Sequence, residues 1–277
     1  MKDLVVSFSG GRTSAYMAKR LLDNPPAGCK LWFVFMNTGL EDQRTLDFID
    51  RCDKEWGFGL IWLEALFNKE KGKGTKYKTV SYEAASRNGE PFYEMVTKYG
   101  VSNKSYPHCN RELKLQPFNA WLTDNCPDAH RAVGIRCDEI DRMAANMDDM
   151  KIIYPLISMW PTRKGDVLGW WSRQDFDLMI PEHYGNCVTC WKKSDRKLLT
   201  LAHDKPELFD HFNKMEIIAR DTGSNAENNK GNFFRGNRST QDILLESKKV
   251  FDRFEDKYFQ AISDESNGCS ESCDLFG

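Results

Sequence analysis

The sequence predicts an α/β protein with an open, mostly parallel sheet flanked by helices. Apolar runs that suit strands alternate with helical runs over residues 4–63, and this order is typical of βαβ units with parallel strands. Residues 31–36 are apolar throughout, as expected of a strand covered on both faces. A glycine turn at residues 9–11 joins the first strand to the first helix. The chain of 277 residues is long enough for such a domain with an appendage.

The first half of the chain supplies three strands of this sheet. Strands are predicted at residues 4–6, 31–36 and 59–63, and helices at 16–22 and 42–56. The lysine- and glycine-rich stretch 69–78 predicts a mobile surface loop, because it holds too few apolar residues to build core. It is either a plain solvated insertion or a lid that contacts polyphosphate or a nucleic-acid backbone.

The second half completes a five-stranded sheet and then becomes helical. Strands are predicted at residues 131–135 and 151–156, and helices at 91–99, 166–171, 206–220 and 240–261. The composition shifts near residue 160, where tryptophans become frequent. We therefore expect an α/β domain over residues 1–160 and a helical, cysteine-bearing extension over residues 161–277 that packs on it.

The turn after the first strand is the strongest candidate for a binding site. Ser7 ends the strand, and the turn reads Ser9-Gly10-Gly11-Arg12-Thr13-Ser14. Glycines allow close backbone approach, hydroxyls can donate, and the N-terminus of the following helix attracts an anion such as phosphate. The spacing differs from the Walker and dinucleotide-binding patterns. An ordinary glycine turn with a capped helix is the plain alternative.

Polar residues also follow other strands, at the edge where open parallel sheets bind ligands. Those after the second and fourth strands are Asn37, Thr38, Gly39, Glu41, Gly134 and Arg136. Between them in the chain, Arg111 and Lys114 lie three residues apart, so one helical face would present both to a phosphate or sulfate. The alternative for this pair is a solvated basic face.

Nine cysteines are present, and two groups have spacing of interest, Cys187-x-x-Cys190 and Cys269-x-x-x-Cys273. Three or four thiolates drawn from Cys109, Cys187, Cys190 and Cys273 would suit an iron–sulfur cluster or a zinc site. Spacing alone does not choose between these metals. The plain alternative is that Cys187 and Cys190 belong to a redox-idle turn.

Bulk properties narrow the class of partner. The net charge of −2 gives no global field that would attract a nucleic acid, although a local basic face remains open. No apolar run reaches the length of a membrane span, and the first residues lead directly into a strand and not into a signal peptide. The sequence therefore predicts a cytoplasmic protein that does not engage a membrane.

Several motifs in order resemble the PP-loop ATP pyrophosphatases, which share the fold of the adenine nucleotide alpha hydrolases. Within them, the motifs are similar to those of the phosphoadenosine phosphosulfate (PAPS) reductase branch. They are the S-G-G-x-x-S of residues 9–14, the turn at 37–41, Cys109-x-Arg111-x-x-Lys114-x-x-Pro117, Gly134-Ile135-Arg136-x-Asp138-Glu139, Tyr154-Pro155-Leu156 and Cys187-x-x-Cys190. The resemblance spans residues 4–195.

The resemblance implies a nucleotide-binding domain over residues 1–160, with adenine near residues 37–41 and phosphates on residues 9–14. It implies that Arg111, Lys114 and Arg136 contact phosphate or sulfate, and that Cys109, Lys114 and Cys273 are catalytic. It favours a [4Fe–4S] cluster on Cys109, Cys187, Cys190 and Cys273, with zinc or no metal as alternatives.

Two departures from this branch change the expected reaction. PAPS reductases usually carry an altered PP-loop, whereas S-G-G-x-x-S is intact here, which favours ATP with Mg²⁺ cleaved between its α- and β-phosphates. Cluster-bearing reductases begin their cysteine set with an adjacent pair, whereas Cys109 is followed by Asn110. The missing ligand would come from the tail, where Cys269 and Cys273 are each either a ligand or a nucleophile.

The leading hypothesis is an adenylating sulfurtransferase supplied by a sulfur donor such as a cysteine desulfurase or a thioredoxin-like protein. The acceptor would be a nucleic acid, with bases stacked on Trp160, Trp170 and Trp171 and backbone held by Lys192, Lys193, Arg196 and Lys197. The alternative for these residues is core packing and a solvated helix face. The rival functions are a sulfonucleotide reductase that releases sulfite and an inactive nucleotide-binding partner subunit.

Overall fold

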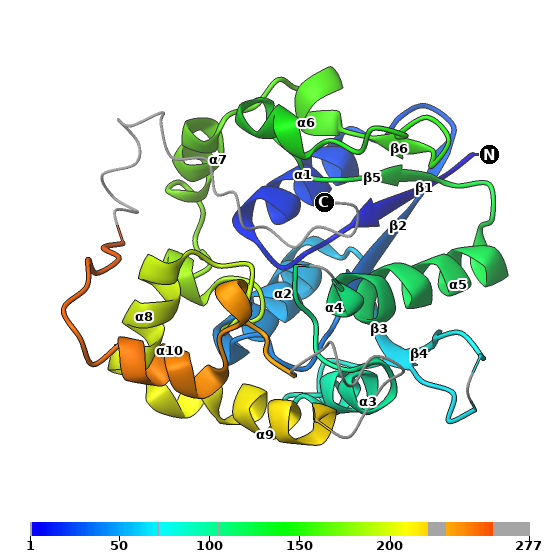
Figure 1. Ribbon diagram of the computed structural model, residues 1–277. Helices are drawn as coiled ribbons and strands as arrows, with labels where there is room; N and C mark the ends of the chain where they lie inside the picture. The colour runs from blue at the N-terminus through cyan, green and yellow to red at the C-terminus, as the bar shows by residue number, and fades with distance from the viewer. Residues whose placement is uncertain (1, 71, 105, 221–230, 257–277) are drawn as a thin grey trace.

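In the computed structural model, which describes residues 2–70, 72–104, 106–220 and 231–256, a mixed sheet runs through the centre of the molecule (Figure 1). Over these residues the sheet has six strands in the order β4-β3-β2-β1-β5-β6. They are β1 (Lys2–Ser7), β2 (Cys29–Met36), β3 (Ile61–Leu66), β4 (Lys76–Val80), β5 (His130–Ala132) and β6 (Ile152–Ile153). All neighbours pair in parallel except β3 and β4. The predicted α/β class with a mostly parallel sheet is confirmed.

The predicted count of five strands is wrong, because β4 adds a sixth from the lysine-rich stretch expected to be a loop. It pairs antiparallel with β3, and Leu63 lies opposite Thr79. Tyr77 packs its ring against the core below the sheet, while the lysines of the strand remain largely exposed. Lysines on an edge strand discourage pairing with other chains, so this composition suits an edge as well as a loop.

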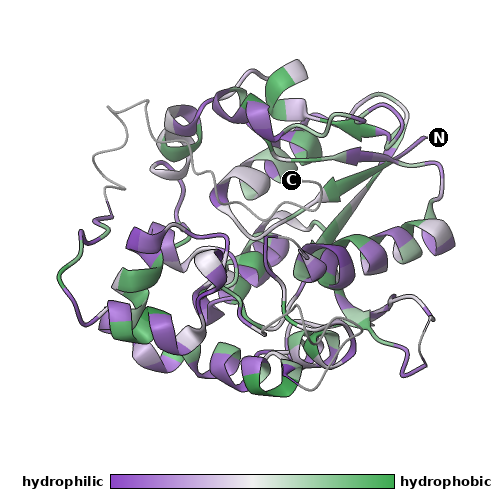
Figure 2. Ribbon diagram, in the orientation of Figure 1, coloured by the Kyte–Doolittle hydropathy of each residue, from purple (hydrophilic) through white to green (hydrophobic). Residues whose placement is uncertain are grey.

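Helices cover both faces of the sheet. On one face, α1 (Arg12–Asp23), α2 (Gln43–Trp56) and α7 (Lys164–Trp171) bury their apolar sides against Phe33 and Phe35 of β2. On the other face, α5 (Gln116–Asn125) packs against Val34 and Met36 of the same strand. Strand side chains alternate between faces, so both sets must be apolar. Figure 2 accordingly shows β2 as hydrophobic while the surrounding helices mix both colours.

A second apolar core lies beside the sheet. It is built by α3 (Glu90–Tyr99), α8 (Asp195–Asp204), α9 (Asp210–Ala219) and α10 (Thr240–Glu246). The buried Glu216 holds this region together, since its carboxylate accepts hydrogen bonds from the backbone N–H groups of Phe233 and Thr240. The predicted helix over residues 240–261 is wrong in length. It ends at Glu246, where Ser247 turns its hydroxyl back onto the carbonyl of Leu244 at 2.9 Å.

Shorter elements complete the described chain. They are α4 (His108–Asn110), a π-helical turn (Arg111–Leu115), α6 (Pro155–Ser158) and 3-10 turns at Cys137–Arg142, Glu182–Tyr184, Pro206–Phe209 and Arg235–Asn237. The predicted helix over residues 206–220 therefore begins as a 3-10 turn and continues as α9. No helix of the described residues is long and apolar enough to cross a membrane.

The strand order places a crevice above β1. The chain adds β2 and β3 on one side of β1 and then returns to add β5 and β6 on the other. Loops that leave neighbouring strands in opposite directions open a crevice at the carboxyl edge, which is where such sheets bind ligands. A side chain at Gly134, just after β5, would place its Cβ 3.3 Å from the Cα of Ser14. The loops after β1 and β5 thus meet at this crevice.

Candidate functional site

The turn after β1 has a backbone conformation that glycine favours. Gly10 has a φ of +82°, and a Cβ there would lie 2.8 Å from Cδ1 of Ile49 and 3.0 Å from Cγ2 of Thr45. Gly11 is the N-cap of α1, and no side chain caps this helix end. The first N–H groups of α1 are therefore left for a ligand at the crevice.

Hydroxyl groups form hydrogen bonds within the turn. Oγ of Ser14 accepts hydrogen bonds from the N–H of Ser9 at 3.1 Å and from its hydroxyl at 3.0 Å. The Ser14 hydroxyl donates in turn to the carbonyl of Gly11 at 2.9 Å. Ser14 is buried and Ser9 is partly exposed. Ser14 therefore shapes the turn, and Ser9 is the hydroxyl better placed to meet a ligand.

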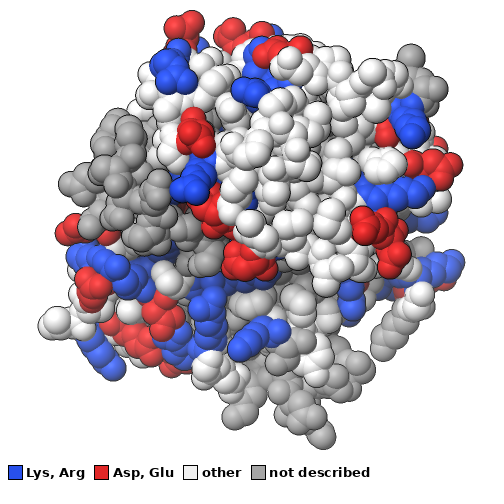
Figure 3. All heavy atoms as spheres, turned by 90° about the horizontal axis from the view of Figure 1, so that it is seen from above, with Lys and Arg blue, Asp and Glu red and all other residues white. Residues whose placement is uncertain are grey.

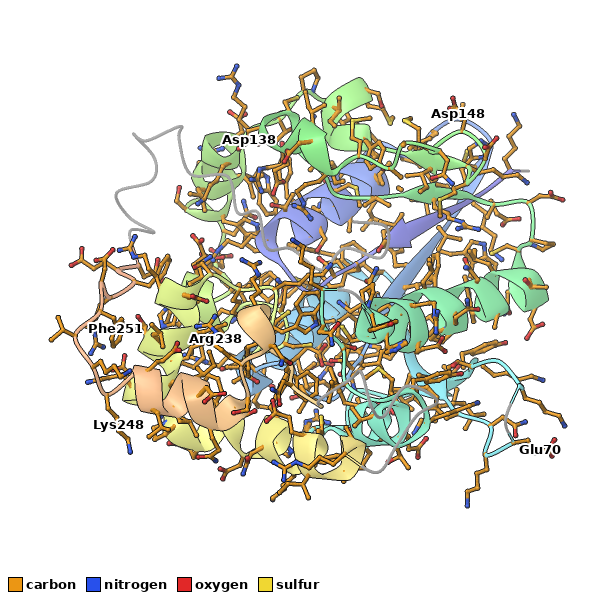
Figure 4. The ribbon with its side chains drawn as sticks, viewed as in Figure 1. Glu70, Asp138, Asp148, Arg238, Lys248 and Phe251 are labelled. Atoms are coloured by element: carbon orange, nitrogen blue, oxygen red, sulfur yellow. The ribbon has the colours of Figure 1, made fainter. Side chains whose placement is uncertain are left out.

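Arg136 reaches the turn from the loop after β5. Its Nη1 donates to Oγ1 of Thr13 at 2.9 Å, its Nε donates to Asp138 at 2.9 Å, and Glu139 pairs with it at 3.2 Å. Burial raises the pKa of Asp138, but the hydrogen bond and charge of Arg136 outweigh it and hold that pKa below its usual value. Asp138 lies beside α7 (Figure 4). The buried guanidinium is thus fixed in place before any ligand arrives.

These residues line one cleft of about 200 Å³. The cleft brings together the predicted residues Ser9, Gly10, Gly11, Arg12, Thr13, Ser14, Gly134 and Arg136. The guanidinium of Arg12 pairs with Asp177 at 2.7 Å, so this side chain anchors the segment after α7 to the turn. Sequence reasoning gave no binding role to Lys164 and Asn186, which also line the cleft. Asn186 has a φ of +59°, which is uncommon outside glycine.

A smaller adjoining cavity contains further predicted residues. Ser7, Glu41 and Lys114 line it, and it shares Ser9 and Asn186 with the cleft, so the two cavities are adjacent. Lys114 belongs to the π-helical turn, where the wider winding separates it from Arg111. Arg111 is half-exposed and pairs with Glu112 at 2.7 Å. The structure thus places Lys114, and not Arg111, among the residues that line these cavities.

The residues after β2 shape their own turn. Asn37 is fully buried and donates to Glu64 at 2.6 Å and to the carbonyl of Ser86 at 2.9 Å. The Glu41 carboxylate accepts from the Thr38 hydroxyl at 2.7 Å and from the N–H of Gly39 at 3.0 Å. Asn37, Thr38 and Gly39 therefore do not line the cleft of Arg136. Sequence reasoning missed Glu64, whose signal is a single carboxylate inside an apolar strand.

Three of the four cysteines predicted to bind metal lie around a third cavity. Cys109, Cys187 and Cys190 line it together with Thr38 and Lys114. The Thr38 hydroxyl and the Cys187 sulfur are 3.2 Å apart. Among the described residues, no three His, Cys, Asp or Glu side chains are arranged so that they could already hold a metal ion. Cys269 and Cys273 lie outside the described residues.

Two of the four cations predicted to hold a nucleic-acid backbone are buried, whereas Lys192 is partly exposed and Arg196 is exposed and pairs with Asp252 at 2.8 Å. Lys193 and Lys197 are 3% and 6% exposed. Lys193 donates to the carbonyls of His183 and Gly185, and Lys197 pairs with Glu182 at 3.2 Å. Trp171 is buried in the core. Figure 3 shows acidic and basic side chains mixed over the face seen from above.

Comparisons with known proteins identify relatives of the chain but no solved structure. It is 33% identical to the uncharacterized nin region protein ORF290 of Escherichia phage lambda over 99% of the chain and 95% of that protein. It is 23% identical to the uncharacterized protein MJ0973 of Methanocaldococcus jannaschii over 91% of the chain and 56% of that protein. The uncharacterized protein MJ0066 of the same archaeon is 28% identical over 49% of the chain and 23% of its own length. No family model and no solved structure matches the chain.

Proposed function

The chain belongs to the family of the nin region protein ORF290 of Escherichia phage lambda, and we propose that it is a PP-loop enzyme that cleaves ATP between the α- and β-phosphates. The turn of residues 9–14 carries this proposal. One cleft is lined by the uncapped start of α1, by glycines that allow close approach to the backbone, and by Arg136, whose guanidinium donates to Thr13. That combination suits the phosphates of a nucleotide.

In the proposed reaction, positioning and charge do most of the work. The N–H groups at the start of α1 and the guanidinium of Arg136 hold the phosphates, and Mg²⁺ bound with ATP neutralises further charge. An oxygen of the acceptor attacks the α-phosphorus, the bond to the β-phosphate oxygen breaks, and pyrophosphate leaves. A sulfur nucleophile then attacks the acceptor carbon that bears the adenylated oxygen, the bond between this carbon and the oxygen breaks, and AMP leaves with the oxygen. The sulfur donor would be a cysteine desulfurase or a thioredoxin-like protein.

The cysteine cavity supports a sulfur or metal role beside the nucleotide. Lys114 lines both this cavity and the one that adjoins the cleft, so the two sites are neighbours. Thiolates are the ligands of both [4Fe–4S] clusters and structural zinc. Cys109, Cys187 and Cys190 would supply three of them, with Cys273 as the proposed fourth. A cluster bound there would supply a redox centre close to the acceptor.

Turnover of labelled ATP tests the reaction. The anaerobically purified protein is expected to release pyrophosphate and AMP from α-labelled ATP with Mg²⁺.

The substitution Ser14→Ala is expected to weaken ATP binding about tenfold, because the turn loses three hydrogen bonds. Ser172→Ala is the matched control, since its hydroxyl makes the same kind of bond to the carbonyl of Gly169 outside the cleft. Sulfite released from PAPS with reduced thioredoxin, and no pyrophosphate from ATP, would establish the reductase instead.

Metal content tests the cysteine cavity. The anaerobically purified protein is expected to contain iron, or zinc if the site is structural, and Cys187→Ser is expected to lose most of it. Cys29→Ser is the control, because Cys29 begins β2 away from this cavity. Elemental analysis and the visible absorbance spectrum measure the outcome. Metal-free protein, or equal metal content in both variants, would contradict the proposed site.

A further inference from the structure

A groove separate from the cleft opens on the other side of α7. Gly165, Asp166, Gly169 and Trp170 of this helix line the groove, whereas Lys164, Val167 and Leu168 line the cleft. The remaining lining residues are Tyr16, Arg20, Met159, Trp160, Pro161, Thr162 and Arg173. We refer to this surface as the Trp160 groove. It is open and measures about 640 Å³.

The two arginines of the Trp160 groove lack the carboxylates that accompany the arginines of the cleft. Arg12, Arg136 and Arg142 each pair with an Asp or Glu. Among the described residues, neither Arg20 nor Arg173 forms such an ion pair. Nε of Arg20 is also buried without a hydrogen-bond partner among them. Nη1 of Arg20 donates to the Tyr16 hydroxyl at 3.5 Å. Because no carboxylate of the described residues neutralises the charge of either arginine, this arrangement points to an anion that comes from outside the chain.

Aromatic rings flank these charges. The Arg20 guanidinium lies 4.9 Å from the centre of the Trp160 ring and 5.8 Å from that of Tyr16. Trp170 packs edge-on against Tyr16 at 5.4 Å. Trp160 and Trp170 are partly exposed, and over the described residues Trp160 has no ring stacked on it. Partly exposed indole rings beside guanidinium groups that have no carboxylate partner suit bases and phosphates together.

The shape of the groove favours a strand over a single nucleotide. A small ligand is usually enclosed on most of its surface, whereas an open groove allows a chain to continue at both ends. Asp166 is the one carboxylate among the lining residues, and it accepts the N–H of Arg163 at 2.8 Å. That hydrogen bond ties it to the start of α7. The two arginines therefore leave the groove with an excess of positive charge.

We propose that the Trp160 groove binds a single-stranded nucleic acid, with phosphates on Arg20 and Arg173 and a base stacked on Trp160 or Trp170. The role of this strand rests on the proposed function, because the bound nucleic acid would be the acceptor that is adenylated. This assignment keeps Trp160 and Trp170 as the residues predicted to stack bases, and it moves the expected backbone contact from the basic residues after Cys190 to Arg20 and Arg173.

Binding of labelled oligonucleotides without ATP tests the groove. A fluorescein-labelled 12-nucleotide single strand, as DNA and as RNA, is expected to bind and to quench tryptophan fluorescence. Arg173→Gln and Arg20→Gln are each expected to weaken binding at least about fivefold and to reduce the slope of log affinity against log salt by about 0.7. Arg51→Gln is the control, because Arg51 of α2 is exposed as Arg173 is, lies outside the groove and pairs with Glu55.

The outcomes separate this inference from the proposed reaction. Equal binding by wild type, Arg173→Gln and Arg20→Gln, or no binding at all, would overturn the groove assignment. AMP that competes as well as the oligonucleotide at equal concentration would overturn it in favour of a mononucleotide site. Because Arg173 is exposed, the Arg173→Gln protein is expected to fold and still tests the groove if the Arg20→Gln protein does not fold. Ser14→Ala is expected to bind the oligonucleotide normally, because Ser14 does not line the groove. Strand binding by a wild-type protein that releases no pyrophosphate from ATP would contradict the proposed function alone.

Discussion

Gly10→Ala is expected to lower the affinity for ATP by at least about tenfold while the protein still folds. An alanine at a φ of +82° costs about 1–2 kcal/mol, and its Cβ would meet Cδ1 of Ile49 at 2.8 Å and Cγ2 of Thr45 at 3.0 Å. The turn relieves both problems by moving, which misplaces the N–H groups that would hold the phosphates. About 1.4 kcal/mol corresponds to a tenfold change in affinity. Calorimetric titration with ATP and Mg²⁺ measures the loss.

Gly28→Ala is the matched control for this substitution. Gly28 has a similar φ of +72°, and no atom lies within 4 Å of the Cβ that alanine would add. It lies before β2, away from the cleft. The control is expected to lose a similar amount of stability and to keep its affinity for ATP. Unchanged affinity in Gly10→Ala would show that this turn does not hold the nucleotide.

The turn around Gly10 could be predicted because its signals are local. An apolar strand, two glycines and a helical run follow one another within 22 residues, and the same residues form β1, the turn and α1. The alternation of Phe33 and Val34 across the sheet was predictable for the same reason. Local pattern sets the face of a strand side chain, and strands buried on both faces are apolar throughout.

Features that depend on distant residues could not be predicted. Thr13 and Arg136 meet although 123 residues separate them, and the sequence gives only their types. Lys193 and Lys197 form a basic run in the sequence, yet folding buries both against carbonyl or carboxylate oxygens. A charged residue type in a sequence does not show that its side chain is exposed, because a cation can be buried where hydrogen-bond or ion-pair partners surround it. Arg20 is the converse case, since within the described part of the chain it lies beside rings and a hydroxyl but pairs with no carboxylate.

Glu64→Ala is expected to lower the free energy of unfolding by about 3 kcal/mol, the largest stability effect among these predictions. The fully buried carboxylate accepts hydrogen bonds from the Asn37 amide and the N–H of Ser86, both at 2.6 Å, and pairs with Lys78 at 3.0 Å. Alanine leaves the Asn37 amide short of a partner in a site that water does not reach. Urea unfolding followed by circular dichroism measures the change.

A matched carboxylate on the surface shows whether burial causes this loss. Glu55 lies 3.9 Å from Arg51 and both side chains are about half exposed, so Glu55→Ala is expected to cost less than about 1 kcal/mol. Glu64→Gln should fall between the two, because its amide oxygen can still accept one hydrogen bond. Asn37 begins the turn in which Thr38 contacts Cys187, so Glu64→Ala should also lower the metal content. A Glu64→Ala protein as stable as Glu55→Ala would mean that the turn after β2 is held by other contacts.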